Sequence, residues 1–204
     1  MAITNYSELQ AAVGRWLNRT DQAPNIPDFI AVGEAKLNRR LRVMDQLKVI
    51  DFLVDAEYMD VPVDWAQTAN IEHDSLQGGE IEYLTPQKFL SARRCVAPTG
   101  KPEYYTLAEQ QMRFAPVPSE PQPTILQYYR LVPPLTDAAP SNWLLTKHPD
   151  VYLAAALLSA NTFLRDMEGV ALATAELADV ISSIQLADQQ DRTSTTPLMR
   201  AQPI

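Results

Sequence analysis

Apolar residues near the N-terminus recur at the three-to-four-residue spacing of an amphipathic helix. Asn5 and Glu8 form a possible capping box at the start of a helix expected over residues 4–18. A second helix is expected to begin at Pro27-Asp28, because proline suits the first helical turn and aspartate suits its positive end. The residues expected on the buried faces of these helices are Leu9, Val13, Trp16, Leu17, Ile30, Leu37, Leu41 and Met44.

The spacing changes at about Leu47 to the alternation that is typical of short strands. Strands are expected on either side of a turn at Pro62, within GGEIEYLTP, around a tight turn at Glu109, and in PTILQYYRLVPPL. A short helix should run from Thr85 to about Arg94. Prolines concentrate in this zone, and because proline cannot donate a hydrogen bond to a strand ladder, the strands should be short.

Helical spacing returns in the C-terminal third, beginning in PSNWLLTKHPDVYLAAALLSANTFL. A helix is expected from Pro149 to about Asp166, with His148 or Thr146 as its cap and Leu158 in its core. Another is expected from Val170 to about Gln190. Its predicted apolar face comprises Leu172, Leu177, Val180, Ile181 and Ile184.

These elements predict an α+β protein that is mainly α. Neither terminal helical part has enough apolar surface for a core of its own. The simplest fold therefore packs residues 1–46 and 140–190 into one bundle of about four helices. Residues 47–139 would form a small inserted β-rich domain. Residues 191–204 lack any period and would form an extended C-terminal tail.

Composition narrows the functional classes. The 204 residues carry a formal net charge of −8, so the chain repels the DNA backbone and is not expected to read DNA sequence. The single cysteine, Cys95, excludes a disulfide within the chain and a cysteine-rich zinc site. The longest uncharged run, residues 151–164, is shorter than the roughly 20 residues of a membrane span, so no membrane association is expected.

Acid–base chemistry is suggested only by Glu72, His73 and Asp74. Adjacent residues in a strand point to opposite faces, whereas acid–base catalysis needs groups that converge. A solvated loop is the simpler interpretation, and a hydrolase using these three residues is an alternative. Two arginines beside Cys95 could lower the pKa of its thiol, but neither histidine is near it in sequence. The sequence therefore predicts no catalytic residue, cofactor or metal site.

Lys36, Arg39, Arg40 and Arg42 form a basic cluster at the end of the second helix. One interpretation is favourable placement at the negative end of the helix dipole. The other is a contact surface for an acidic partner or a neighbouring subunit, which suits head-to-tail packing of an acidic chain. The C-terminal tail can also gain order on a partner. Its candidate contact residues are Arg192, Leu198, Met199, Arg200 and Ile204.

Six segments along the chain are informative by their order and spacing. They are YSELQAAVGRWLNRTDQAPNIPDFIAVGEAKLNRRLR, DVPVDW, EIEYLTPQKF, GKPEYYTL, TILQYYRLVPPL and NWLLTKHPDVYLAAALLSANTFLRD. Together they resemble phage head-to-tail connector proteins of the adaptor type, over about residues 4–190. More remotely, the chain resembles the tail tubular or gatekeeper proteins of short-tailed phages, and both groups share a helical domain with an inserted β domain.

The resemblance implies a structural virion protein at the head-tail junction rather than an enzyme. Such proteins form a ring of about twelve copies beneath the portal. The implied partners are the portal protein, a tail or nozzle protein and further copies of the chain, while genomic DNA passes through without specific binding. The C-terminal segment would reach into the portal. A cytoplasmic helical binding module unrelated to virions is the remaining alternative.

Overall fold

The computed structural model describes residues 3–74 and 79–193. Its fold is mixed α and β, with 47% of residues in helices and 25% in strands, which confirms the α+β class. The chain divides into two compact units. The helical unit comprises Met1–Asp45 and Val132–Ile204, and the β unit comprises Gln46–Leu131.

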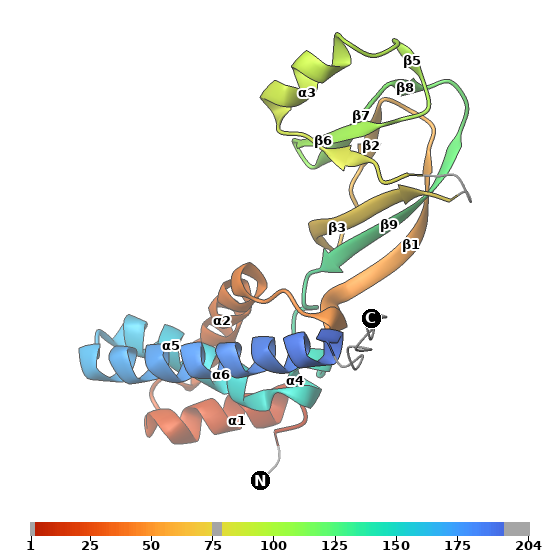
Figure 1. Ribbon diagram of the computed structural model, residues 1–204. Helices are drawn as coiled ribbons and strands as arrows, with labels where there is room; N and C mark the ends of the chain where they lie inside the picture. Colours follow the sequence, from red (N-terminus) through yellow and green to blue (C-terminus); the bar gives the residue numbers. More distant parts are fainter. Residues whose placement is uncertain (1–2, 75–78, 194–204) are drawn as a thin grey trace, which may run out of the picture. The chain divides into compact units, whose positions relative to one another are not determined.

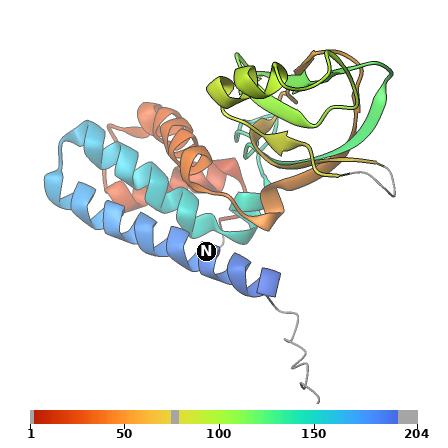
Figure 2. The same ribbon diagram turned by 45° about the horizontal axis from the view of Figure 1, so that its top comes forward.

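The described part of the helical unit contains five α-helices, rather than the four expected, and Figure 2 shows α5 running between α2 and α6. The additional helix is α4, which is short and separate because Asn142 caps it and Pro149 begins the next helix. The elements are α1 (Tyr6–Leu17), η1 (Ala23–Asn25), α2 (Ile26–Arg40), α4 (Trp143–Lys147), α5 (Pro149–Leu164) and α6 (Met167–Thr193), with η2 (Met44–Gln46) at the end of the N-terminal segment.

Helix α5 is the centre of the helical core. It contacts α1, α2, α4 and α6, and every residue from Val151 to Ala160 is buried. A helix that is apolar on all sides belongs in the interior, so its composition matches its place. Gly33 brings α2 close to it: a Cβ atom at this position would lie 3.1 Å from the carbonyl carbon of Ala155.

The helix starts predicted from Asn5, Pro27-Asp28 and Pro149 are confirmed to within a residue, whereas α6 begins at Met167, three residues before the predicted start at Val170. The Asn5 side chain accepts a hydrogen bond from the Glu8 backbone N–H at 2.9 Å. The Glu8 carboxylate accepts from the Thr4 backbone N–H at 2.7 Å rather than from that of Asn5, so the box reaches one residue further back. His148 occupies the cap position before Pro149, but its side chain makes no capping hydrogen bond.

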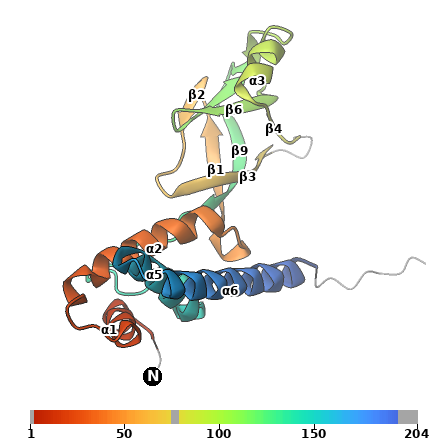
Figure 3. The same cartoon turned by 90° about the vertical axis from the view of Figure 1, so that its left-hand side faces the viewer.

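The β unit contains two main sheets, with strand orders β1-β9-β3 and β2-β7-β6-β4, and a small sheet of β5 and β8. Strand β9 pairs antiparallel with both β1 and β3, and α3 contacts β6 (Figures 1 and 3). The elements are β1 (Leu47–Val54), β2 (Tyr58–Asp60), β3 (Trp65–His73), β4 (Glu82–Tyr83), α3 (Pro86–Arg93), β5 (Thr99–Gly100), β6 (Tyr104–Ala108), β7 (Gln111–Ala115), β8 (Val117–Pro118) and β9 (Gln122–Arg130).

The two main sheets of the β unit share one small core. Thr124, Leu126 and Tyr128 alternate with less buried residues along β9, which is the period of a strand with one buried face. The opposite sheet contributes Met112 and Phe114, both fully buried. The hairpin between β6 and β7 turns through Glu109 and Gln110, which both have positive φ, so the predicted tight turn is confirmed.

The segment after β9 differs from the sequence-based expectation. Residues 132–139 were assigned to the inserted β-rich region, but Val132 and Leu135 are buried in the helical core. The Val132 N–H donates to the Asn38 side chain and the Leu135 N–H to the Glu34 carboxylate, both at 2.8 Å. Side chains of α2 therefore satisfy a proline-rich segment that can form no regular ladder.

Candidate functional site

The acid–histidine cluster of β3 has a structural geometry. His73 is buried, and its Nε2 lies 2.8 Å from the backbone oxygen of Pro102. Burial lowers the pKa of this imidazole. Glu72 lies on the opposite face of the strand, and Asp74 is exposed after the strand ends. The three side chains do not converge. Across residues 3–74 and 79–193, moreover, no group of three metal-ligating side chains forms a candidate metal site.

Cys95 is exposed and carries a free thiol. Its neighbour Arg93 forms an ion pair with Glu57, which also accepts a hydrogen bond from Arg113 at 2.8 Å. The Arg113 guanidinium stands 5.5 Å from the Phe89 ring centroid. These contacts join α3 to the hairpin of β6 and β7, so Arg93, one of the two arginines near the thiol in sequence, has a structural role.

The structure divides the basic cluster of α2 into two pairs. Lys36 donates to the Ser159 hydroxyl at 3.0 Å, and Arg42 donates to the backbone oxygen of Asn38 at 2.8 Å. Arg42 thus follows the helix-end interpretation. Arg39 and Arg40 are exposed, and neither forms an ion pair with any charge in the described part of the chain. Burial and these two arginines lower the pKa of Lys36.

Three residues expected in the helical core lie on its surface. Trp16 is 63% exposed, Leu172 is 71% exposed, and Met44 is also exposed. Trp16 and Leu172 line a hollow of about 500 Å³ with parts of α1, α5 and α6. Clustered exposed apolar side chains commonly mark contact surfaces. Trp16 and Leu172 lie in helices as predicted but are exposed, whereas Met44 lies beyond the end of α2, in η2.

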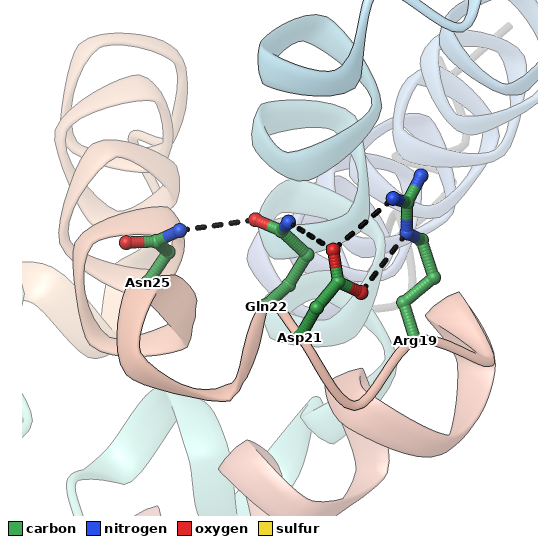
Figure 4. Close-up of polar contacts among 4 residues, drawn as sticks. All are labelled: Arg19, Asp21, Gln22 and Asn25. Atoms are coloured by element: carbon green, nitrogen blue, oxygen red, sulfur yellow. Dashed lines mark hydrogen bonds and ion pairs between the residues drawn. The ribbon is translucent and has the colours of Figure 1, made fainter.

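The connection between α1 and α2 borders a second, more open groove of about 730 Å³. Four side chains of this connection form the chain of polar contacts in Figure 4. Arg19 binds Asp21 at 3.1 Å, Gln22 donates to the same carboxylate at 2.8 Å, and Asn25 donates to Gln22 at 3.0 Å. The ion pair lowers the pKa of Asp21 and raises that of Arg19. An exposed pair of this kind adds little to the stability of the fold.

Helix α6 is long and apolar for a surface helix. Its stretch Met167–Arg192 meets the length and hydropathy of a membrane span, and 22% of the apolar window is buried. Core helices of soluble proteins meet the same criteria, so this alone is weak evidence for a membrane. The helix packs one face into the core through Ala173, Leu177, Ile181 and Ile184. Its other faces remain open.

Glu34 is a buried carboxyl group that the sequence analysis did not single out. Its Oε1 accepts hydrogen bonds from the Leu135 N–H at 2.8 Å and the Tyr152 hydroxyl at 3.3 Å. Burial raises the pKa of Glu34 and of Tyr152. The signal was available, because Glu34 lies at helical spacing from Ile30 and Leu37 on the buried face of α2.

A family model described as "SU10 adaptor protein" matches residues 4–201. The chain belongs to the SU10 adaptor protein family. This is a family of phage structural adaptors and not of enzymes, so the resemblance to adaptor-type connectors is confirmed. No curated protein matches the sequence.

Membership of the SU10 adaptor family draws attention to the C-terminal segment, because the match continues to residue 201. Arg192 forms an ion pair with Asp188 at 2.8 Å, one turn earlier in α6. The remaining candidate contact residues of the tail lie outside the residues that the structure describes. They are Leu198, Met199, Arg200 and Ile204.

Proposed function

We propose that this adaptor forms a ring beneath the portal, joins the capsid vertex to the tail and lines the DNA exit channel. The observation that carries this proposal is the family match, which spans nearly the whole chain. The partners are the portal protein, a tail or nozzle protein and further copies of the chain. The protein acts as a virion component at the head-tail junction.

The charge of the chain suits a channel wall. A formal net charge of −8 repels phosphates, so DNA can move past the ring without being held. The exposed Arg39 and Arg40 offer the opposite charge at one end of α2. An acidic chain with a local basic surface can therefore bind its own copies while it repels DNA.

Loss of the gene tests this placement. Phage lacking the protein should produce heads that carry portal but no tail, and wild-type protein supplied in trans should restore infectious particles. A triple variant, Glu72→Ala, His73→Ala and Asp74→Ala, isolates the hydrolase alternative. If it folds, we expect it to restore particles as well as the wild type does. Tailed, infectious particles in the absence of the protein would contradict the proposal.

The proposed portal contact of the C-terminal tail has its own test. A variant that ends at Gln190 removes Arg192, Leu198, Met199, Arg200 and Ile204 together. We expect it to keep the wild-type circular dichroism spectrum and to lose co-sedimentation with purified portal. A matched point variant, Met199→Asp, should weaken portal binding. Undiminished binding by the truncated protein would assign the portal contact to another surface.

A further inference from the structure

The outer face of α2 carries a basic stripe, which we define as Val32, Lys36 and Arg39. These residues lie at positions i, i+4 and i+7, so they follow one line along the helix. Val32 is 51% exposed, Lys36 is half-buried and Arg39 is exposed. No carboxylate in the described residues pairs with Arg39 or its neighbour Arg40. The positive charge of the stripe is therefore not neutralised by any carboxylate among the described residues.

The outer face of α6 carries an acidic stripe, which we define as Leu172, Glu176 and Asp179. All three residues are exposed. Neither acid forms an ion pair within the described part of the chain. The exposed Ala175, one turn before Asp179, leaves room for another helix to approach closely. This stripe accounts for part of the open apolar surface of α6.

The two stripes match in spacing and are opposite in charge. Each begins with a large apolar residue and continues with charges four and seven positions later, a length of about 10 Å along a helix. When α2 and α6 of different copies pack parallel, Val32 meets Leu172, and Lys36 and Arg39 meet Glu176 and Asp179. Contact between two copies of the same stripe would instead oppose like charges, which disfavours a two-fold symmetric dimer.

The stripes lie on two different helices of the helical unit. Helix α5 contacts both α2 and α6 and runs between them (Figure 2). Gly33 of α2 and Leu177 of α6 face the core, and the exposed residues of each stripe lie on other sides of their helices. A contact between different faces of identical copies repeats head to tail and closes into a ring when the rotation permits.

We propose that the acidic stripe of one copy docks on the basic stripe of the next, and that this contact builds the ring. The inference rests on the proposed function, which requires a ring but does not say which surfaces form it. The apolar pair at one end excludes water, and the charged pairs determine register and direction.

Charge reversal tests the contact with a built-in rescue. Variant A carries Asp179→Lys, and variant B carries Arg39→Glu, so that the proposed contact between Lys36 and Glu176 is left unchanged in both. Each variant alone should need at least about tenfold higher concentration than wild type for half-maximal assembly on the portal, measured by sedimentation velocity. Mixed in equal amounts, A and B should regain wild-type assembly, because each reversed stripe then meets its complement in an alternating ring.

Cross-linking gives a second, independent measurement. The free thiol is first removed by Cys95→Ser, and Val32→Cys and Leu172→Cys are then introduced together. Mild oxidation of the assembled protein should yield a ladder of covalent multimers. The single variants, Val32→Cys or Leu172→Cys in the same background, should yield no species larger than a dimer.

The outcomes separate this inference from the proposed function. Rings formed by wild type, and equally by folded A and B alone, would overturn the stripe contact and leave the adaptor function standing. Failure of the A–B mixture to assemble would also overturn it. Monomeric wild type in the presence of portal would overturn the ring itself. Binding of wild type to phospholipid vesicles, lost with Leu172→Asp, would assign the acidic stripe to a membrane and overturn docking between copies.

Discussion

The centres of the helical unit and of the β unit are packed in different ways. Helix α5, at the centre of the helical unit, carries several buried alanines and comes close to α2 where Gly33 meets Ala155. The β unit fills the space between two sheets with a small cluster that includes the large side chains of Phe114 and Tyr128. A close helix contact through small residues tolerates added volume poorly, whereas a small cluster that depends on large side chains tolerates loss of volume poorly.

The largest expected effect is loss of the helical unit by Leu158→Asp. Leu158 is buried on α5, so an aspartate there would place a charge in the core at a cost of roughly 4 kcal/mol or more. Circular dichroism should show loss of most helical signal. The control is Leu186→Asp, the same change at an exposed position of α6, which should keep the wild-type spectrum. A folded, monodisperse Leu158→Asp variant would mean that the core assignment is wrong.

The corresponding change in the β unit removes volume. Phe114→Ala should lower the free energy of unfolding by about 3–5 kcal/mol, because the ring is fully buried between the sheets. Urea denaturation measures this free energy. Hydrogen exchange should show reduced protection of the amides in β6 and β7, with the amides of α5 less affected. Equal loss of protection in α5 would show that the two units unfold as one.

Substitution of two helical glycines by alanine tests the close packing of the helical unit, because each change adds one methyl group. Gly33→Ala gains helix propensity but places a Cβ atom 3.1 Å from the backbone of α5. We therefore expect the free energy of unfolding to fall by about 1–2 kcal/mol. Gly14→Ala places its Cβ 3.4 Å from the end of the Ile26 side chain and should gain about 0.5–1 kcal/mol. Thermal unfolding of both variants measures this. Stabilisation by Gly33→Ala would contradict the close approach of α2 and α5.

The buried titratable groups predict a smaller effect of pH in the helical unit. Burial raises the pKa of Glu34 above its ordinary value of 4.5, so the folded state binds this proton more tightly than the unfolded state. The stability that the protonated Glu34 adds to the folded state is greatest below pH 4.5 and is lost as the pH rises through the raised pKa. Glu34→Gln should therefore remove a decline in stability with rising pH, measured by denaturation midpoints from pH 4 to 8. Parallel curves for variant and wild type would contradict this.

His73 predicts the opposite sign in the β unit. Burial lowers its pKa below 6.5, so the unfolded state binds the proton more tightly. The stability that the neutral His73 adds to the folded state is fully present above pH 6.5. It is lost as the pH falls from 6.5 toward the lowered pKa. In the same titration, His73→Gln should remove a decline in stability toward acid pH. An unchanged acid limb would show that His73 is not neutral in the folded protein.

The sequence predicted the elements well because their signals are local. Asn5, Pro27 and Pro149 mark helix starts through capping and proline geometry, and the turn at Glu109 follows from strand alternation on both sides. Tertiary placement was harder. The sequence predicts that residues 132–139 belong with the preceding strand in the β-rich region. In the structure, hydrogen bonds to side chains of α2 hold them in the helical unit.

The incorrect core predictions carry information about the candidate site. Trp16, Met44 and Leu172 have the spacing of buried residues but are exposed. Periodicity reports which side chains avoid water and does not reveal whether the chain itself or a partner covers them. The charges of Arg39 and Arg40 were predicted as a contact surface, but only the structure shows that they lack ion pairs within the described residues, and their partner remains a proposal.

The central claim is that this adaptor assembles on a portal as a ring, and native mass spectrometry tests it most directly. Purified full-length protein is mixed with purified portal, and the masses of the resulting complexes are recorded at several ratios. The account predicts one dominant complex whose added mass is a fixed whole number of adaptor copies, with few partial occupancies at saturation. Free portal beside monomeric adaptor at every ratio would contradict it.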